Sequence, residues 1–547
     1  MHPLDLIVLV LYFIGITWYG LWVSRRTSTT EAYFRGNRKF KWWTMMGQAF
    51  GTGTHAEMPV AQAGVSYSGG FSTIWYQWKN LLITPFYWLM APWYRRSRRT
   101  TVAELVRDRY GSLVGLMYTV FAIFFFVFNM GSMLQGAAKV ISIASGEVIS
   151  SNWIVVIMTV VFIVYSFFGG LVAAAHTEFV QGLLIIILSF MLIPAGLHQI
   201  GGFTGMRSVL PPDFFELLTS KSGLGGFTIA MLALNGIVGI TAQPHMMTMF
   251  ATGENELVSR AGQTYGNFIK RLVTIGWVLT GMITAALVIK TGVTLGDPEH
   301  AFGYATRTLL SPGLVGLMMA CILAANMSTA SNFMVNLGAL FVKDIYHPYL
   351  KPQASDQELL VAGKFAGLGL TFIGIAFALS IKSVLSAFLF TETVAAFMGI
   401  IVFGGFLWKR GNRYGAITAV AAAFLIYYVQ NYLHEEQLLL VYKWRPEPFG
   451  IALLVGFLVY VTVSLLTKPE PSAALEDFFQ RMQTHSDGDG QQVDRELILL
   501  DVSTWFTVRR WANFSVRYRT EWWGFVIAWL TVAALIFIAW IILYLGQ

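Results

Sequence analysis

Charged side chains are scarce in this sequence of 547 residues. Asp, Glu, Lys and Arg together make up 12% of the chain, whereas a soluble domain carries about 25%. Hydrophobic residues make up 56% of it. This balance excludes an ordinary soluble protein and indicates an integral membrane protein whose main surroundings are a lipid bilayer.

Cysteine is nearly absent as well. The single cysteine, Cys321, lies in an apolar segment, so the chain cannot form an internal disulfide. A basic stretch is also missing ahead of the first apolar segment, because the chain starts with Met-His-Pro-Leu-Asp. We therefore expect the first segment to be a retained membrane helix rather than a cleaved signal peptide.

The formal net charge is nevertheless +8. A basic balance can suggest nucleic acid, but here the basic residues gather in short loops beside apolar segments, which is the positive-inside pattern of membrane proteins. The clusters lie at 25–41, 95–109, 409–413 and 509–519. We expect these loops on the cytoplasmic side of a cell membrane, both chain termini outside, and no nucleic-acid partner.

Apolar segments of about 20 residues are long enough to cross a bilayer as helices, and the sequence holds about 14 segments of this kind. They lie at 4–23, 43–66, 71–94, 113–140, 153–168, 177–197, 227–250, 268–289, 314–341, 359–381, 384–408, 414–432, 449–466 and 523–545. The polar stretch 468–521 between the last two is predicted to be a flexible cytoplasmic linker.

The second apolar segment makes a poor helix in its middle, at residues 47–59. Gly51 and Gly53 each cost about 1 kcal/mol relative to Ala in a helix interior, and Pro59 removes a backbone donor. Broken backbone at membrane depth is tolerated only where it is buried in protein or lines a cavity. We therefore interpret this stretch as the place where a cation and a solute bind.

A second interrupted segment runs from Asn235 to His245 and contains Gly236, Gly239 and Pro244. It comes five apolar segments after the first interrupted segment. Two interruptions at matching places in two halves of a chain are typical of an inverted-repeat transporter and point to its binding site.

Several motifs resemble those of the sodium:solute symporter family, which includes the sodium/glucose, sodium/proline and sodium/sialic acid carriers. In chain order they are 31–43, 165–181, 243–245, 327–332 with 344–346, and 407–416. The resemblance spans roughly residues 5–465 and implies an all-α polytopic fold of the LeuT-like kind, a five-plus-five inverted repeat.

This fold divides the chain into an N-terminal accessory helix and loop (1–42), the transport core (43–410), accessory helices (411–467), the linker (468–521) and a last membrane helix (522–547).

The resemblance also implies a cation site. Ala325, Ser328 and Thr329 are spaced so that they share one face of a helix. On spacing alone, the two hydroxyls could equally bond back to their own helix or hold helices together. By similarity to the family, the carbonyls of Gly51, Thr54 and Ala325 and the hydroxyls of Ser328 and Thr329 would hold one sodium ion.

Glu178 stands where the family usually has Asp. By similarity, a carboxylate there could support a second cation or the exit of the ion. It could equally be a charge that complements a helix N-terminus.

Charged groups at membrane depth are costly and are usually functional. Glu57 lies in the first interrupted segment, and Lys79 and Glu392 lie in two other apolar segments. Either carboxylate could pair with Lys79, and the sequence does not choose between them.

By similarity to the family, the solute would contact residues around the first interruption and one residue of the second. These residues are His55, Glu57, Met58, Tyr76, Gln77, Asn80 and Asn235. His55 could bind solute, carry a proton, or hydrogen-bond a freed carbonyl. Met58 stands where the galactose carriers of the family have Gln, which argues against recognition of the galactose type.

The resemblance implies sodium-coupled symport of a small organic solute (a sugar, an amino acid or a carboxylate) by alternating access. Two alternatives stay open: a proton-coupled carrier that uses His55 or Glu178, and a transporter-like sensor of solute. The sequence shows no nucleophile–base set, so we expect no enzyme activity. We expect a monomer or a weak homo-oligomer.

Overall fold

The computed structural model describes residues 2–24, 40–51, 54, 55, 57–219, 223–381, 383–486, 492–494, 497–507, 511 and 514–547. For some of these, among them 165–182, 324, 325 and 328, it describes the backbone alone.

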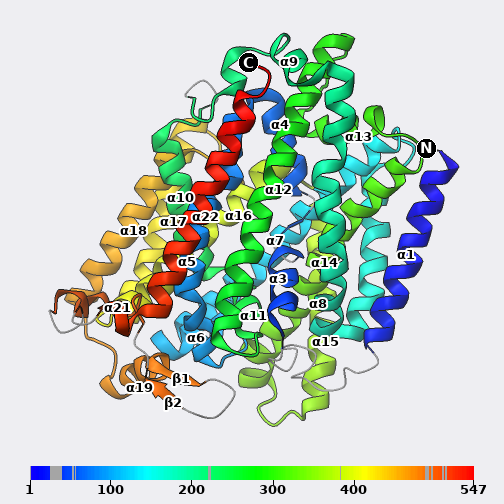
Figure 1. The fold of residues 1–547 in the computed structure, drawn as a ribbon. Coiled ribbons are helices and arrows are strands. Elements are labelled where there is room, and N and C mark those ends of the chain that lie inside the picture. Colours follow the sequence, from blue (N-terminus) through cyan, green and yellow to red (C-terminus); the bar gives the residue numbers. More distant parts are fainter. Residues whose placement is uncertain are drawn as a thin grey trace.

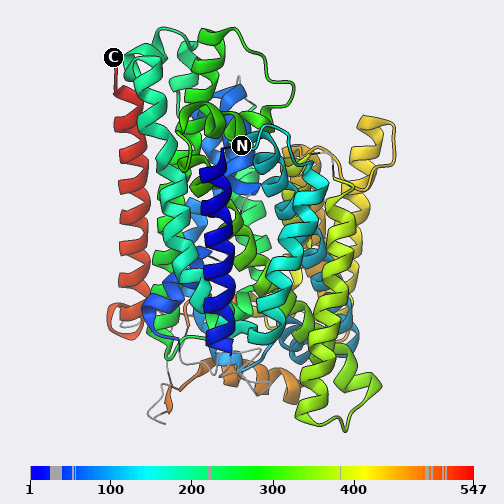
Figure 2. The ribbon, with the colours of Figure 1, turned by 90° about the vertical axis from the view of Figure 1, so that its right-hand side faces the viewer.

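Long helices run side by side through one bundle, and both ends of the chain lie at the same end of it (Figure 1). A second view shows the same placement, with α1 facing the viewer and the last helix at one edge (Figure 2). The long helices are α1 (Pro3–Ser24), α3 (Trp42–Gly51) with α4 (Glu57–Gly69), α5 (Trp75–Ser97), α7 (Ser112–Ala144), α8 (Ser151–Ile200), α10 (Gly226–Ala242) with α11 (Met246–Ala251), α12 (Glu256–Thr291), α14 (Leu314–Leu340), α15 (Asp356–Ala378), α16 (Val384–Leu407), α17 (Arg413–Glu435), α18 (Pro446–Leu466) and α22 (Arg519–Tyr544).

Shorter elements connect the long helices or lie against the ends of the bundle. They are η2 (Phe71–Ile74), α6 (Val102–Tyr110), α9 (Gly202–Arg207), η3 (Pro212–Phe215), η4 (Pro298–His300), α13 (Ala301–Leu309), η5 (Phe341–Leu350), α19 (Ser472–Gln483), η6 (Val502–Phe506) and α21 (Phe514–Arg517). The short strands β1 (Thr484–Ser486) and β2 (Gln492–Asp494) pair antiparallel.

Seven of the described helices are long and apolar enough to cross a membrane, judged by length and composition, and shorter apolar helical stretches add to them. These lengths follow from the sequence, because a crossing needs about 20 apolar residues.

α8 joins two apolar segments that the sequence predicts to be separate crossings. Its last residue, Ile200, accepts a hydrogen bond from Lys290 near the end of α12. Gly146, just before α8, lies against Arg307 of α13. Both ends of α8 are therefore at the end of the bundle that carries α9 and α13 (Figure 1). A straight helix of this length would reach about 75 Å, so α8 bends back and passes through the bundle twice.

Glycines let α12 pack along both halves of the first interrupted helix. Gly262 and Gly266 lie against α3, and Gly281 lies against α4. A Cβ on any of the three would come within 3.0 Å of the facing helix. Lys270 and Arg271 lie between these contacts, so they are placed at the level of the gap between α3 and α4.

The polar stretch 468–521, predicted to be a linker, holds a helix, α19, that contacts the bundle in its described parts. Arg481 of α19 pairs with Asp108 of α6 at 2.8 Å. Arg96 of α5 donates to the carbonyl of Met482 at 2.9 Å. These contacts dock α19 beneath the bundle, at the end opposite the termini (Figure 1).

A buried ionic network lies beside α19. Glu256 accepts hydrogen bonds from Arg96 and Arg260, both at 2.8 Å. Arg260 also reaches Glu521 at the start of α22, at 2.9 Å. The network joins α5, α12 and α22, and removing one member of such a buried set typically costs about 3–5 kcal/mol, because it leaves a buried charge unpaired.

Candidate ion and solute site

The first interrupted helix is broken where the sequence predicts. α3 ends at Gly51 and α4 begins at Glu57, and the described residues between them, Thr54 and His55, are not helical. Backbone carbonyls at the end of one helix and N–H groups at the start of the next have no partner within their own helix. The break therefore provides polar backbone groups in the middle of the bundle.

Oxygen atoms gather at this break. The hydroxyl of Thr329 on α14 donates to the carbonyl of Gly51 at 3.4 Å. The hydroxyl of Thr54 is buried and has no hydrogen-bond partner among the residues that the structure describes. Hard oxygen ligands bind hard cations of calcium's size at about 2.3–2.6 Å, so two oxygens 3.4 Å apart can both reach one such ion.

Three residues predicted from the sequence to act on the cation fall outside the described side chains. They are Ala325 and Ser328 on α14 and Glu178 on α8. Ala325 and Ser328 remain on the helix that approaches the break through Thr329.

The second interruption is narrower than predicted. α10 continues as helix from Asn235 to Ala242, and only Gln243, Pro244 and His245 separate it from α11. Tyrosine hydroxyls satisfy the carbonyls at the end of α10. Tyr94 donates to Thr241 at 2.8 Å, and Tyr118 donates to Ala242.

A cavity of about 60 Å³ lies between the two breaks. Both breaks contribute to its wall, together with α5, α7, α12, α14 and α16. Its polar lining residues are His55, Asn80, Tyr87, Asn129, Gln243, His245, Asn267, Lys270, Arg271 and Glu392. We call this space the central cavity.

Two pairs of ionisable side chains are buried at the central cavity. Lys79 of α5 pairs with Glu392 of α16, which answers the question that the sequence leaves open. Glu57 at the start of α4 pairs with the ring Nδ1 of His55. Each carboxylate that the sequence places at membrane depth therefore has a partner.

Sequence reasoning missed the two other cations of the central cavity, Lys270 and Arg271. Their side chains are buried, with exposed fractions of 5% and 1%. They lie near the start of the predicted segment 268–289, next to more polar sequence, and therefore resemble the basic end of a membrane helix. The available signal was that both fall inside an apolar segment.

The predicted solute residues divide between several places. His55, Met58 and Asn80 line the central cavity, and Glu57 contacts it through His55. Tyr76 lines a different cavity.

Gln77 and Asn235 are buried and line none of the described cavities. Asn235 instead donates a hydrogen bond to Thr393 of α16, at 3.2 Å.

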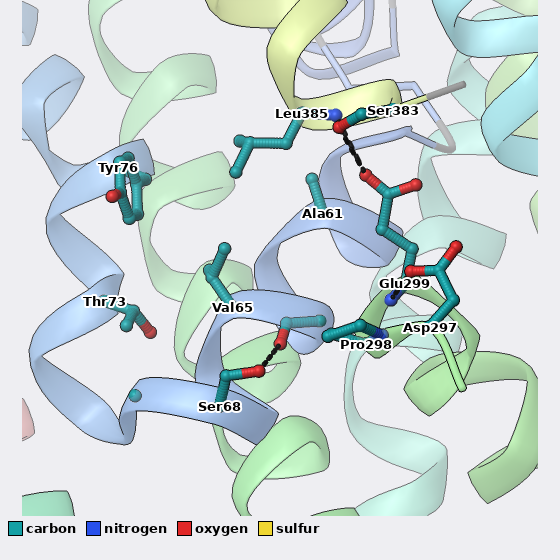
Figure 3. A pocket seen from close by; sticks show the side chains of 12 residues that line it. Ala61, Val65, Ser68, Thr73, Tyr76, Asp297, Pro298, Glu299, Ser383 and Leu385 are labelled. Atoms are coloured by element: carbon teal, nitrogen blue, oxygen red, sulfur yellow. Dashed lines mark hydrogen bonds between the residues drawn. The ribbon is translucent and has the colours of Figure 1, made fainter. Parts of the chain in front are cut away.

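The cavity that Tyr76 lines is larger, about 420 Å³, and lies between α4, η4 and the start of α16 (Figure 3). η4 leads directly into α13, which lies toward the end of the bundle that carries the termini (Figure 1). We call the cavity that Tyr76 lines the outer cavity. Asp297 and Glu299 line it, and Lys139 of α7 pairs with both, at 3.1 and 2.5 Å. Burial opposes the charged form of Asp297, but the backbone N–H of Glu299 and the charge of Lys139 hold its pKa below its ordinary value.

Comparison with known proteins places the chain among sodium-coupled carriers. The model of the sodium:solute symporter family matches residues 33–422. The high-affinity proline transporter of Bacillus subtilis is 28% identical over 486 residues, which cover 85% of this chain and 98% of that protein. The sodium/glucose cotransporter of Vibrio parahaemolyticus is 25% identical over 468 residues, which cover 77% and 83%.

Solved structures show the same fold. A Na⁺-coupled sialic acid symporter superposes with a TM-score of 0.71 at 16% identity, covering 86% of this chain and 99% of that one. A nucleobase-cation-symport-1 family transporter gives a TM-score of 0.53 at 13% identity, covering 83% and 99%. The predicted all-α, LeuT-like fold with its five-plus-five inverted repeat is confirmed.

Proposed function

The chain belongs to the sodium:solute symporter family, and we propose that it holds sodium at the break between α3 and α4 and holds its solute in the central cavity. It is a multi-pass membrane transporter that couples sodium to a small solute, and it is not an enzyme. The assignment of the two sites to these places is the part that we propose.

The contact of Thr329 with Gly51 is the observation that best supports the proposed sodium site. It joins α14 to the end of α3 across the break, and the unpartnered hydroxyl of Thr54 lies in the same broken stretch. Ala325 and Ser328, on α14 with Thr329, would complete a set of carbonyl and hydroxyl oxygens. Such a set suits a small, hard cation without a carboxylate.

The two cavities support alternating access. The outer cavity lies toward one end of the bundle, and the central cavity lies at the two breaks. Solute would enter by the outer cavity and reach the central cavity as α3–α4 and α10–α11 close around it. Tyr76, which lines the outer cavity, would then contact solute on its way in.

The driving force per sodium ion is substantial. One positive charge that moves inward at 100 mV supplies about 2.3 kcal/mol, and a tenfold sodium gradient adds about 1.4 kcal/mol. Together these could concentrate a neutral solute roughly several hundredfold.

The orientation that we propose places both termini outside a plasma or inner membrane. The termini share one end of the bundle, and the basic element α6 lies at the other end (Figure 1). Because basic loops are retained in the cytoplasm, the end with α6 would face it. Glu178 would serve ion exit or a second cation on this model.

We propose a monomer or a weak homo-oligomer as the working unit. Both breaks, the central cavity and the residues that line them come from one chain, so no second copy is needed to complete the site.

Uptake by the purified full-length protein in liposomes tests the function. An inward sodium gradient should drive accumulation of at least one solute from a panel of sugars, amino acids and carboxylates, and choline in place of sodium should abolish it. The function would be wrong if no solute of the panel accumulated. Uptake that persists in choline and rises as pH falls would point instead to proton coupling through the His55–Glu57 pair.

A further inference from the structure

Two neighbouring cations of α12 face the central cavity at the level of the first break. Lys270 and Arg271 both line the cavity. Adjacent residues on a helix point about 100° apart, so the cavity covers a wide arc of α12. The backbone of this turn is held in place, because its Arg271 carbonyl accepts a hydrogen bond from Trp78 at 2.9 Å.

The carboxylates of the cavity are engaged elsewhere. Glu392 pairs with Lys79, and Glu57 pairs with His55. Lys270 lies near both carboxylates but forms no ion pair with a residue that the structure describes. Lys79, Lys270 and Arg271 thus face two carboxylates that already have partners.

The side chain of Arg271 has hydrogen-bond donors that are not used within the described part of the chain. Its side chain contacts Tyr87, yet its Nε and Nη1 atoms have no hydrogen-bond partner within the described part of the chain. A guanidinium carries five N–H donors in a planar fork that matches a carboxylate. Leaving such donors unmet in a buried place is costly, and a bidentate anion would satisfy them.

We propose that Arg271 and Lys270 bind a carboxylate of the transported solute, so that the carried solute is a small organic acid without an amino group. This inference rests on the proposed function and narrows its solute class. One carboxylate would meet the free donors of Arg271 and lie beside Lys270 on the cavity wall.

The other solute classes fit less well. A sugar or polyol would bring no carboxylate to the unmet donors of Arg271. A zwitterionic amino acid would satisfy Arg271, but its ammonium group would need a free carboxylate, and Glu57 and Glu392 are both paired. Asn80, Asn129 and Asn267 on the cavity wall can hydrogen-bond the hydroxyl or keto groups of a small acid.

Pairs of acids and their amides test the inference, because each pair differs only in the carboxylate. The full-length protein in detergent is heated with propionate or propionamide, and with lactate or lactamide, in sodium chloride and in choline chloride. Glucose and proline complete the panel. We expect at least one acid to raise Tm in sodium, and we expect its amide, glucose and proline to leave Tm unchanged.

Variants then test whether Arg271 and Lys270 bind the carboxylate of the solute. Arg271→Gln and Lys270→Gln should each weaken binding of the acid at least tenfold, and Arg271→Lys should weaken it less than Arg271→Gln does. Lys364→Gln, which removes a cation on α15 away from the cavity, is the matched control and should bind as wild type. Sodium alone should still raise the Tm of every variant, which shows that the protein is folded and the cation site intact.

Several results would overturn the inference. Sodium-dependent binding of glucose or of an amide as strong as that of the acid would do so, and so would acid binding unchanged in both Gln variants, or no binding of either acid. Binding of proline alone would remove the restriction to acids without an amino group. If a neutral solute is bound with sodium, the symport function stands, and only the inference that the solute carries a carboxylate is wrong. If neither sodium nor any solute changes Tm, the proposed function fails with it.

Discussion

The two interrupted helices sit at matching places in the inverted repeat, yet they are broken differently. At the first, α3 ends at Gly51 and α4 begins at Glu57, whereas at the second α10 ends at Ala242 and α11 begins at Met246. At the second, tyrosine hydroxyls meet the last carbonyls of α10. At the first, the Gly51 carbonyl accepts from the Thr54 backbone N–H at 3.3 Å and from the Thr329 hydroxyl at 3.4 Å, and the Thr54 hydroxyl has no partner among the described residues.

This difference indicates a division of labour. The contacts to the Gly51 carbonyl are long, at 3.3 and 3.4 Å, and the Thr54 hydroxyl beside it is unmet among the described residues, so an ion could take these oxygens. The first break therefore suits sodium, and the second supplies a fixed wall of the central cavity. The two breaks therefore occupy equivalent positions in the repeat but differ in how their polar groups are hydrogen-bonded.

The largest effect is expected from Thr329→Ala, which removes a proposed sodium ligand at the first break. Sodium-driven uptake should fall to background, and the sodium concentration for half-maximal Tm stabilisation should rise at least tenfold. Thr371→Ala is the control, because Thr371 is an equally buried threonine that bonds back to Gly367 of its own helix. Equal sodium affinity in the two variants would remove the first break from the comparison as the ion site.

A smaller loss is expected from Gly136→Ala on α7. The added Cβ would lie 2.8 Å from the Cα of Glu57, so the start of α4 must shift. Overpacking of this kind costs about 1–3 kcal/mol. Uptake assays should show sodium affinity several-fold weaker, and thermal unfolding should show a lower Tm.

Gly369→Ala on α15 is the matched control, because nothing lies within 4 Å of its added Cβ. If Gly136→Ala keeps wild-type sodium affinity, the position of α4 does not set the ion site.

At the second break we expect an effect on stability alone. Tyr118→Phe and Tyr94→Phe each remove one hydrogen bond to the end of α10, which contributes about 0.5–1.5 kcal/mol. Tm should fall by a few degrees while sodium affinity stays unchanged. Tyr427→Phe is the control, because the buried Tyr427 hydroxyl has no partner among the described residues. A loss of sodium affinity in Tyr118→Phe would contradict the division between the two breaks.

The smallest effect on transport is expected just after α14, the helix that reaches the first break. Burial, together with the charge of Glu104, raises the pKa of Asp344 to about 7, and Thr101 donates to this carboxyl at 2.9 Å. The folded chain therefore binds the proton more tightly than the unfolded chain, whose Asp titrates at about 3.9. Its stability should decline as pH rises from about 4 to 7, by up to about 1.4 kcal/mol per pH unit from this group.

Asp344→Asn should remove that part of the decline while leaving sodium affinity unchanged. Thermal unfolding of both proteins at pH 5, 6, 7 and 8 measures it, with the variant gaining relative to wild type as pH rises. Parallel pH profiles would show that Asp344 is charged in the fold throughout this range.

The sequence predicted the membrane fold, the first break and the helices that flank it, because these depend on local features: apolar length, Gly51, Gly53 and the motifs of the family. The extent of the second break was not predictable in this way. Gly236 and Gly239 look like helix breakers, but they remain helical and let α10 pack closely on α5 and α16. A glycine that breaks a helix and a glycine that packs it against a neighbour look alike in sequence.

Contacts between distant parts of the chain could not be predicted from the sequence either. Lys79 pairs with Glu392, which lies 313 residues away in the sequence. Arg481 of α19 pairs with Asp108, which lies 373 residues away. The docking of α19 depends on such pairs, since its own composition indicates only a polar stretch. Lys270 and Arg271 lie beside the first break because the glycines of α12 pack this helix against α3 and α4. That packing could not be read from the sequence.

The buried ionic network beside α19 has a consequence for biosynthesis. Chains emerge from the ribosome in order, N-terminal part first, so α5 and α12 enter the membrane long before α22. Until α22 arrives, Arg260 lacks Glu521, one of its two carboxylate partners. A nascent chain without α22 therefore holds Arg260 through Glu256 alone, and the ion pair that joins α12 to α22 forms only after α22 has been made.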